Sequence, residues 1–158
     1  MTLTDSNEVN KNQQIDQSVV EAGKTLKEIV TEAEVVNRLV NGIDGCAVQL
    51  QNFQDNIMAC ILADYGPLED VTISIEHILL EAFCMENDIK VIKVDSSKKI
   101  KKFLSTLQKN NKYTERSGDY TCMLIKHPKE ADEKSLDNLI KFDKLHDIWR
   151  WHIIEFPV

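Results

Sequence analysis

The segment VTISIEHILLEAFCMEND, residues 71–88, contains more apolar side chains than one face of an amphipathic helix needs. On a helical wheel of about 100° per residue, these side chains divide into two stripes. The broad stripe, which we expect to face the protein core, contains Ile75, Ile78, Leu79, Ala82 and Phe83. The narrow stripe contains Ile73, Leu80 and Cys84, with His77 at its edge. The segment therefore predicts a second apolar contact in addition to the one with the core.

We interpret the narrow stripe, which comprises Ile73, His77, Leu80 and Cys84, as a self-association surface. Burying a large aliphatic side chain contributes about 1.5–3 kcal/mol before association costs, so the stripe is compatible with a two-fold dimer. The alternative is that another helix of the same chain covers the stripe. Residues 43–51 are then the candidate neighbour, because only one strand and one turn separate the two helices.

Apolar periodicity along the chain alternates between helices and short strands that are apolar almost throughout. Helices are predicted at residues 15–37, 43–51, 71–87, 97–108 and 133–145. Strands are predicted at residues 38–40, 57–63, 89–94, 120–126 and 149–156. Residues 1–14 have no periodic apolar positions, and we expect a disordered tail. The alternation is typical of a three-layer α/β/α sandwich, which we expect as a single domain over residues 15–158.

The 158-residue chain has a net charge of −7 and four cysteines, none of them in a CxxC pair. Most of these cysteines lie within apolar runs, so we expect buried free thiols of an intracellular protein rather than disulfides. No apolar run approaches the ~18 residues of a membrane span, and the polar N-terminus does not resemble a secretory signal. The acidic charge disfavours nucleic-acid binding. Residues 90–112 alone carry +7, and their lysines either remain solvated or bind phosphate or an acidic partner.

The sequence contains no catalytic or metal-binding pattern. It has no GxGxxG, P-loop, GxSxG or HExxH motif, and no histidine is spaced with another histidine or cysteine as in a zinc pair. We therefore expect no enzymatic activity, cofactor or metal. Asp64, Glu69 and Asp70 follow the strand at residues 57–63, and we predict that they form the rim of a partner site for basic surfaces. The alternatives are a solvated turn and, for Asp70, a carboxylate that stabilises the N-terminus of the next helix.

Two segments resemble the growth-arrest and DNA-damage-inducible (Gadd) stress proteins. DNIMACILA, residues 55–63, matches the Asp-Asn pair that opens an apolar strand ending in Leu-Ala. AFCMENDI, residues 82–89, matches the Ala-Phe-Cys-x-Glu-Asn-Asp-Ile block that ends the following helix. The resemblance covers residues 23–103 well and residues 120–157 loosely. It implies an α/β/α fold with a mixed central sheet, like that of kink-turn-binding ribosomal proteins.

The resemblance also implies a function. Members of the family are non-enzymatic stress-response regulators that bind and activate a MAP kinase kinase kinase. They also bind the mitotic cyclin-dependent kinase with its cyclin, a cyclin-dependent kinase inhibitor and the replication sliding clamp, and they occur in the nucleus and cytoplasm. Their self-association favours the dimer interpretation of the narrow stripe. We therefore expect a homodimeric regulator of growth arrest or apoptosis, with no membrane partner.

The chain departs from the family pattern in one turn and in one helix. The turn DYGPLED, residues 64–70, is shorter and less acidic than the family's, so partners that recognise its charge should bind more weakly. The helix at residues 97–108 is more basic than in relatives.

RNA binding is the alternative function, because kink-turn binders share the implied fold. Their Gly-x-Asn-Glu-x-x-Lys motif, however, is replaced at residues 42–48 by GIDGCAV, which lacks the amide donor and the lysine.

Overall fold

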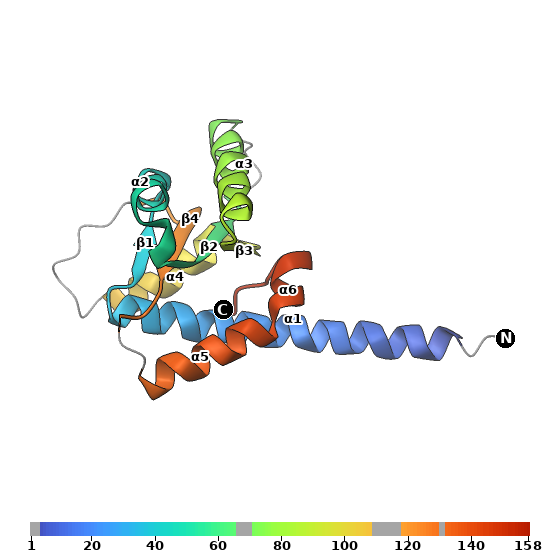
Figure 1. Cartoon of the computed structure of the whole chain (residues 1–158). Helices are drawn as coiled ribbons and strands as arrows, with labels where there is room; N and C mark the ends of the chain where they lie inside the picture. The colour runs from blue at the N-terminus through green and yellow to red at the C-terminus, as the bar shows by residue number, and fades with distance from the viewer. Residues whose placement is uncertain (1–3, 66–70, 109–117, 130–131) are drawn as a thin grey trace.

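The computed structural model describes residues 4–65, 71–108, 118–129 and 132–158. The elements in these ranges follow the order helix, strand, helix through most of the chain (Figure 1). They are α1 (Thr4–Val35), β1 (Leu39–Asn41), α2 (Ile43–Phe53), the single-turn helix η1 (Gln54–Asn56), β2 (Ile57–Ala63), α3 (Val71–Glu86), β3 (Lys90–Val94), α4 (Ser97–Gln108), β4 (Cys122–Lys126), α5 (Glu133–Lys144) and α6 (His146–Trp151).

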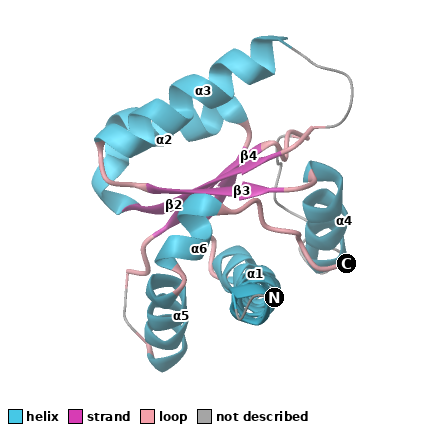
Figure 2. Cartoon of the chain, turned by 90° about the vertical axis from the view of Figure 1, so that its right-hand side faces the viewer, coloured by secondary structure: helices cyan, strands magenta, loops and turns pink. Residues whose placement is uncertain are grey.

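The four strands form one mixed sheet in the order β1-β4-β2-β3. β2 pairs with β3 in parallel and with β4 in antiparallel orientation, and β1 pairs antiparallel with β4. Helices α2 and α3 cover one face, and α1, α4, α5 and α6 lie on the other (Figure 2). Because β2 lies between two strands and two helix layers, all seven of its residues are buried. The predicted α/β/α arrangement with a central mixed sheet is confirmed.

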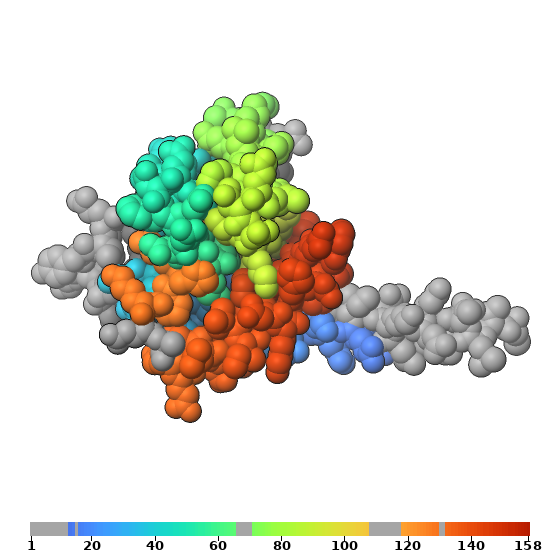
Figure 3. All heavy atoms as spheres, in the orientation of Figure 1, coloured from blue at the N-terminus to red at the C-terminus, as the bar shows by residue number. Residues whose placement is uncertain are grey.

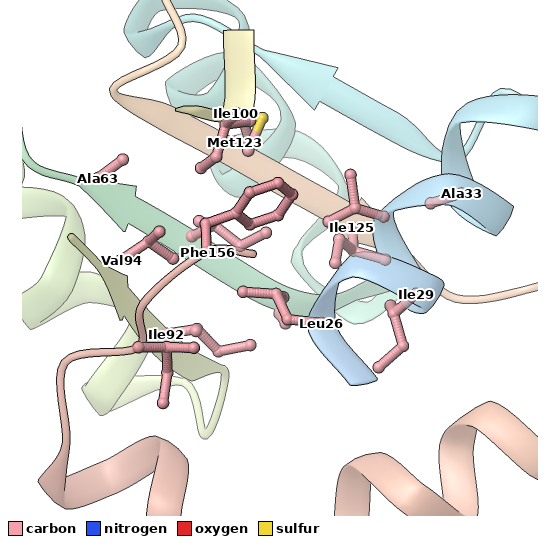
Figure 4. Close-up of a cluster of buried hydrophobic side chains, with 14 of the residues drawn as sticks. Leu26, Ile29, Ala33, Ala63, Ile92, Val94, Ile100, Met123, Ile125 and Phe156 are labelled. Carbon is pink, nitrogen blue, oxygen red and sulfur yellow. The ribbon is translucent and has the colours of Figure 1, made fainter. Parts of the chain in front are cut away.

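The larger core lies between the sheet and α1, whose fully buried residues begin at Ala22. Figure 4 shows Leu26 and Ile29 of α1 beside side chains of β3 and β4 and beside Phe156 from the segment after α6. Phe156 is fully buried, and Ile154 forms a parallel bridge with Val94 at the end of β3. The segment after α6 therefore completes a core that starts in the first helix.

Gly23 makes the close contact between α1 and this segment possible. A Cβ atom at position 23 would lie 2.6 Å from the carbonyl oxygen of Glu155, a distance that side chains do not adopt. The segment is also fixed by Asp95, which accepts a hydrogen bond from the Phe156 amide at 3.0 Å. The same carboxylate pairs with Lys99 of α4 at 2.6 Å. Three elements of the fold thus hold residues 154–156 in place.

Two predicted elements differ from the structure. The predicted strand at residues 149–156 is wrong, because residues 146–151 form α6. Trp149 is buried and its indole donates to the Phe142 carbonyl, whereas Trp151 is 70% exposed. α1 begins at Thr4, within the residues for which we expected a tail, and projects beyond the other elements (Figure 1), while residues 1–3 lie outside the described residues. A helix stabilised by packing further along can continue into polar residues that have no apolar period of their own.

Candidate functional site

The broad apolar stripe of α3 faces solvent, which is the opposite of the prediction. Ile78 is 65% exposed and Leu79 is 63% exposed. Ile75 and Ala82 are also exposed, and Phe83 is only half-buried. In Figure 3 the atoms of α3, in yellow-green, form the top of the molecule beside those of α2. No residue in the described part of the chain covers this stripe.

The narrow stripe of α3 faces the sheet instead. Leu80 is 8% exposed and Cys84 is fully buried, while Ile73 and His77 are half-buried. Leu80 and Cys84 pack in a second apolar cluster with side chains from α2, the sheet and the turn before β3. Its other buried members are Cys46, Leu50, Ile57, Cys60, Leu62, Ile89, Cys122 and Leu124. The prediction that this stripe is an open self-association surface is therefore wrong. The intramolecular alternative is the one observed, with the sheet as well as α2 covering the stripe.

The composition of this layer explains the reversal. Among the described elements, α2 and α3 are the ones on this face of the sheet, so none of the described helices covers the outer side of α3 (Figure 2). Cysteines at positions 60, 84 and 122 are small, and they allow a narrow stripe to pack closely on the strands. A helical wheel measures the width of an apolar stripe but does not show which side the sheet occupies.

A cavity of about 440 Å³ lies beside α3, at the carboxyl ends of the parallel strands β2 and β3. The described residues that line it are Leu62, Ala63, Asp64, Tyr65, His77, Ile78, Glu81, Lys93, Val94, Asp95 and Ile153. Ile78 belongs both to this cavity and to the exposed stripe, so the two features form a continuous surface. The lining has more carboxylates than ammonium groups, and the carboxyl ends of parallel strands are common ligand sites in α/β proteins.

His77 gives this cavity a buried polar atom for which the described residues supply no hydrogen-bond partner. Its ring stands edge-on against Tyr65, with centroids 5.8 Å apart and an angle of 83° between the ring planes. Its Nε2 atom is buried and forms no hydrogen bond within the described part of the chain. A buried polar atom without a partner costs about 1–3 kcal/mol. A partner group that enters the cavity and bonds to His77 would therefore recover part of that cost.

Of the three acidic residues predicted to form a partner rim, the structure places Asp64 at the cavity. Its side chain is exposed, and Glu69 and Asp70 lie outside the described residues. The Asp64 backbone is fixed, because its amide donates to the Val94 carbonyl at 3.1 Å and its carbonyl accepts from the Ser97 amide at 2.8 Å. Asp64 therefore presents its carboxylate from a defined position.

Sequence reasoning missed Tyr65, Lys93 and Ile153 as members of the same cavity. They come from three parts of the chain that only the parallel pairing of β2 and β3 and the course of the last segment bring together. Lys93 forms an ion pair with Glu81 of α3 at 3.1 Å, which connects the helix to the strand. The sequence did contain one signal for a site at this edge of the sheet, because two predicted apolar strands end just before Asp64 and Asp95.

The four cysteines are buried free thiols, as predicted. They lie together between the sheet and the α2–α3 layer, where their sulfur atoms hydrogen-bond to one another. Hydrogen bonds from Cys46 and Cys60 lower the pKa of Cys122 to about 5, burial opposes this shift, and the nearby His77 assists it. Hydrogen bonding to Cys122 and burial raise the pKa of Cys60 well above its ordinary value. In the described part of the chain, no group of three or more histidine, cysteine or acidic side chains has a geometry that could hold a metal ion.

Comparison with known proteins identifies the family of the chain. No family model matches it. The growth arrest and DNA damage-inducible protein GADD45 alpha of Rattus norvegicus is 31% identical over 129 residues, which are 76% of this chain and 77% of that protein. The chain belongs to the GADD45 family. GADD45 gamma of Homo sapiens is 31% identical over 113 residues, which are 69% of this chain and 67% of that protein. GADD45 beta of Bos taurus is 27% identical over 111 residues, which are 70% of this chain and 69% of that protein.

Membership of the GADD45 family confirms the resemblance that residues 55–63 and 82–89 carry. The relatives are named for growth arrest and for induction by DNA damage. Among the helices that the structure describes, none has the length and apolar character needed to cross a membrane.

Proposed function

We propose that this GADD45-family protein is a non-enzymatic stress-response regulator that acts by binding other proteins. The observation that supports this proposal best is the exposed apolar stripe of α3 next to an acidic cavity. Contiguous exposed apolar surface is uncommon on soluble monomers and marks sites of association. The family relationship adds a regulatory setting, since relatives are named for growth arrest and DNA damage.

The main partner in this proposal is a MAP kinase kinase kinase, which the protein binds and activates. A binding protein activates a kinase only if it binds one kinase conformation more tightly than another. The apolar stripe would supply affinity, and the carboxylate of Asp64 at the cavity would favour a basic surface and speed association. The cyclin-dependent kinase with its cyclin, its inhibitor and the replication sliding clamp are further proposed partners, in the nucleus and cytoplasm, with growth arrest or apoptosis as the outcome.

We place self-association on the broad stripe of α3 rather than on the narrow one. Ile75, Ile78, Leu79 and Ala82 are exposed at helical spacing, so the stripe can pack against its copy across a two-fold axis. Each large aliphatic side chain buried in that way contributes about 1.5–3 kcal/mol before association costs. A kinase that binds the same stripe would compete with the dimer.

The test is the double variant Ile78→Glu, Leu79→Glu, with Val20→Glu as the matched control. Val20 is an apolar residue of α1 that is 58% exposed and distant in sequence from α3. Sedimentation velocity should show a monomer for the double variant, and co-expression with the kinase should no longer raise phosphorylation of downstream stress kinases. The control should retain both properties. A double variant that is folded by circular dichroism and still activates the kinase would contradict the proposal.

A further inference from the structure

A second cavity, of about 600 Å³, lies at the opposite end of strand β2 from the first. β4 runs antiparallel to β2, and its last residue, Lys126, pairs with the first residue of β2, Ile57. The cavity is enclosed by the end of α1, by the residues after β4 and by the beginning of α5, which lie at the same end of the molecule in Figure 1. It is therefore separate from α3 and from the acidic cavity.

Buried polar side chains form a fixed floor in this cavity. Arg38, Glu32 and Ser135 all line it, and each is 9% exposed or less. Glu32 accepts from Ser135 at 2.6 Å and pairs with Arg38 at 3.2 Å, while Arg38 also donates to the Lys126 carbonyl at 2.8 Å. These bonds connect α1, β4 and α5, so the cavity has a shape that does not depend on one flexible side chain.

The charge around this floor is unbalanced toward the positive side. Among the described residues of the lining, the basic ones are Arg38, Lys126, Lys129 and Lys134, and the acidic ones are Glu32 and Asp132. Both carboxylates are already engaged, Glu32 by Arg38 and Ser135, and Asp132 by the Ser135 amide at 2.7 Å. Within the described ranges, Lys126, Lys129 and Lys134 form no ion pair. Three ammonium groups at the cavity are thus available to an anionic partner.

The cavity also has an apolar wall. Val35 and Val36 line it, and they are 68% and 53% exposed. Pro128 adds a third apolar side chain between Lys126 and Lys129. An occupant that fits this lining needs carboxylates for the lysines and an apolar side chain for the valines.

We propose that this cavity binds an acidic segment of a partner protein in which a large apolar side chain lies next to carboxylates. The partner is opposite in charge to the one expected at the acidic cavity beside α3, so this is a separate docking site. Lysine ammonium groups bind carboxylates as mobile point charges, and this suits a peptide whose backbone is flexible. Such a contact should be weak and sensitive to salt.

A compact phosphate fits the lining less well. The N-terminus of α5 would be its usual backbone site, but the Asp132 carboxylate already accepts there from the Ser135 amide. A phosphate also has no apolar group for Val35, Val36 and Pro128, which form one wall of the cavity. Nucleic acid is disfavoured by the net charge of −7 and offers no apolar group for the valines.

The test uses the full chain and the fluorescein-labelled peptide Glu-Glu-Leu-Leu-Glu-Glu, followed by fluorescence anisotropy at low salt. The double variant Lys126→Glu, Lys129→Glu should weaken binding by about tenfold or more, because it reverses two of the three unpaired lysine charges of the lining. The matched control Lys101→Glu, Lys102→Glu makes the same change in net charge on exposed lysines of α4 and should change the affinity by less than about threefold. Both variants should keep the circular dichroism spectrum of the original protein.

The apolar wall is tested by Val36→Asn, with Glu-Glu-Ser-Ser-Glu-Glu as the second peptide. The original protein should prefer the leucine peptide, and Val36→Asn should remove that preference while retaining the salt dependence. An equal loss in the α4 control would overturn the proposal in favour of a non-specific charge effect. Inorganic phosphate that displaces the peptide at equal concentration, or tighter binding of single-stranded RNA than of the peptide, would also overturn it.

Discussion

The Ser135 hydroxyl donates a 2.6 Å hydrogen bond to a carboxylate oxygen of Glu32, although 103 residues separate the two in the chain. The Asn138 amide donates to the other carboxylate oxygen. Arg38 pairs with the same carboxylate at 3.2 Å. Glu32 is therefore a buried charge whose partners come from α5 and from the turn after α1, and it fastens α5 to the first helix.

Replacing Glu32 by Ala should lower the free energy of unfolding by about 3–5 kcal/mol, because Arg38 then keeps a buried charge without its carboxylate. Urea denaturation followed by circular dichroism measures the change. Glu28→Ala is the matched control, since Glu28 pairs with Lys141 at 3.5 Å on the exposed surface of the same two helices. The control should lose less than ~1 kcal/mol. Similar losses in both variants would show that the buried network has no special role.

Asp119→Asn should reduce stability in a pH-dependent way. Burial raises the pKa of Asp119, but hydrogen bonds from the Thr121 hydroxyl, the Thr121 amide and the Ile43 amide bring it below its ordinary value. A depressed carboxyl pKa contributes stability that is fully present above the unfolded value and is lost as pH falls through the folded value. The variant should be about 1–2 kcal/mol less stable at pH 7, and the difference should shrink below pH ~4. A difference that stays constant between those conditions would contradict this assignment.

Gly23→Ala should destabilise the protein even though Ala is the better helix former. The added Cβ would meet the Glu155 carbonyl oxygen at 2.6 Å, which forces the segment after α6 away from α1. Gly45→Ala in α2 is the control, because its Cβ would lie 3.5 Å from Val40, an ordinary contact. Thermal unfolding should show a lower midpoint temperature for Gly23→Ala. For Gly45→Ala the midpoint should be unchanged or higher, which corresponds to a gain of up to about 1 kcal/mol in the free energy of unfolding. A stabilised Gly23→Ala protein would show that this contact is easily relieved.

Replacing Asp64, Glu69 and Asp70 together by Ala should weaken kinase binding several-fold and reduce its dependence on salt. Each exposed charge contributes less than ~1 kcal/mol and acts mainly on the association rate. Binding kinetics at two salt concentrations measure both effects. The control replaces Asp16, Glu21 and Asp137, which are exposed acidic residues of α1 and α5, and changes the net charge equally. Unchanged affinity at low salt would identify the acidic turn as a solvated loop.

The sequence was sufficient for the layers of this fold, because the apolar run at residues 57–63 must be buried on both faces and amphipathic helices must cover it. It was not sufficient for the orientation of α3. Both stripes of that helix are apolar, and the choice between them depends on how many helices share its layer, which no local pattern contains. The broad stripe of α3 would have been buried only if a third helix in the same layer had packed against it.

The candidate site shows the same limit at the level of single residues. Asp64 could be named from its position after a strand, whereas Tyr65, Lys93 and Ile153 join it only through the parallel pairing of β2 with β3 and the course of the last segment. The apparent strand at residues 149–156 failed for a related reason. In so short a segment, alternating apolar side chains fit one turn of helix as well as a strand, and burial of Trp149 decides between them.

The insertion of Phe156 between α1 and the sheet has a consequence for the order of events during protein synthesis. α1 leaves the ribosome early, but the apolar side chains of Leu26 and Ile29 obtain their complete surroundings only after residue 156 has emerged. Until then, part of the core is open to water and to other apolar surfaces in the cell, a condition that chaperones recognise in nascent chains. The time between the synthesis of residue 29 and that of residue 156 therefore sets how long this part of the core stays exposed.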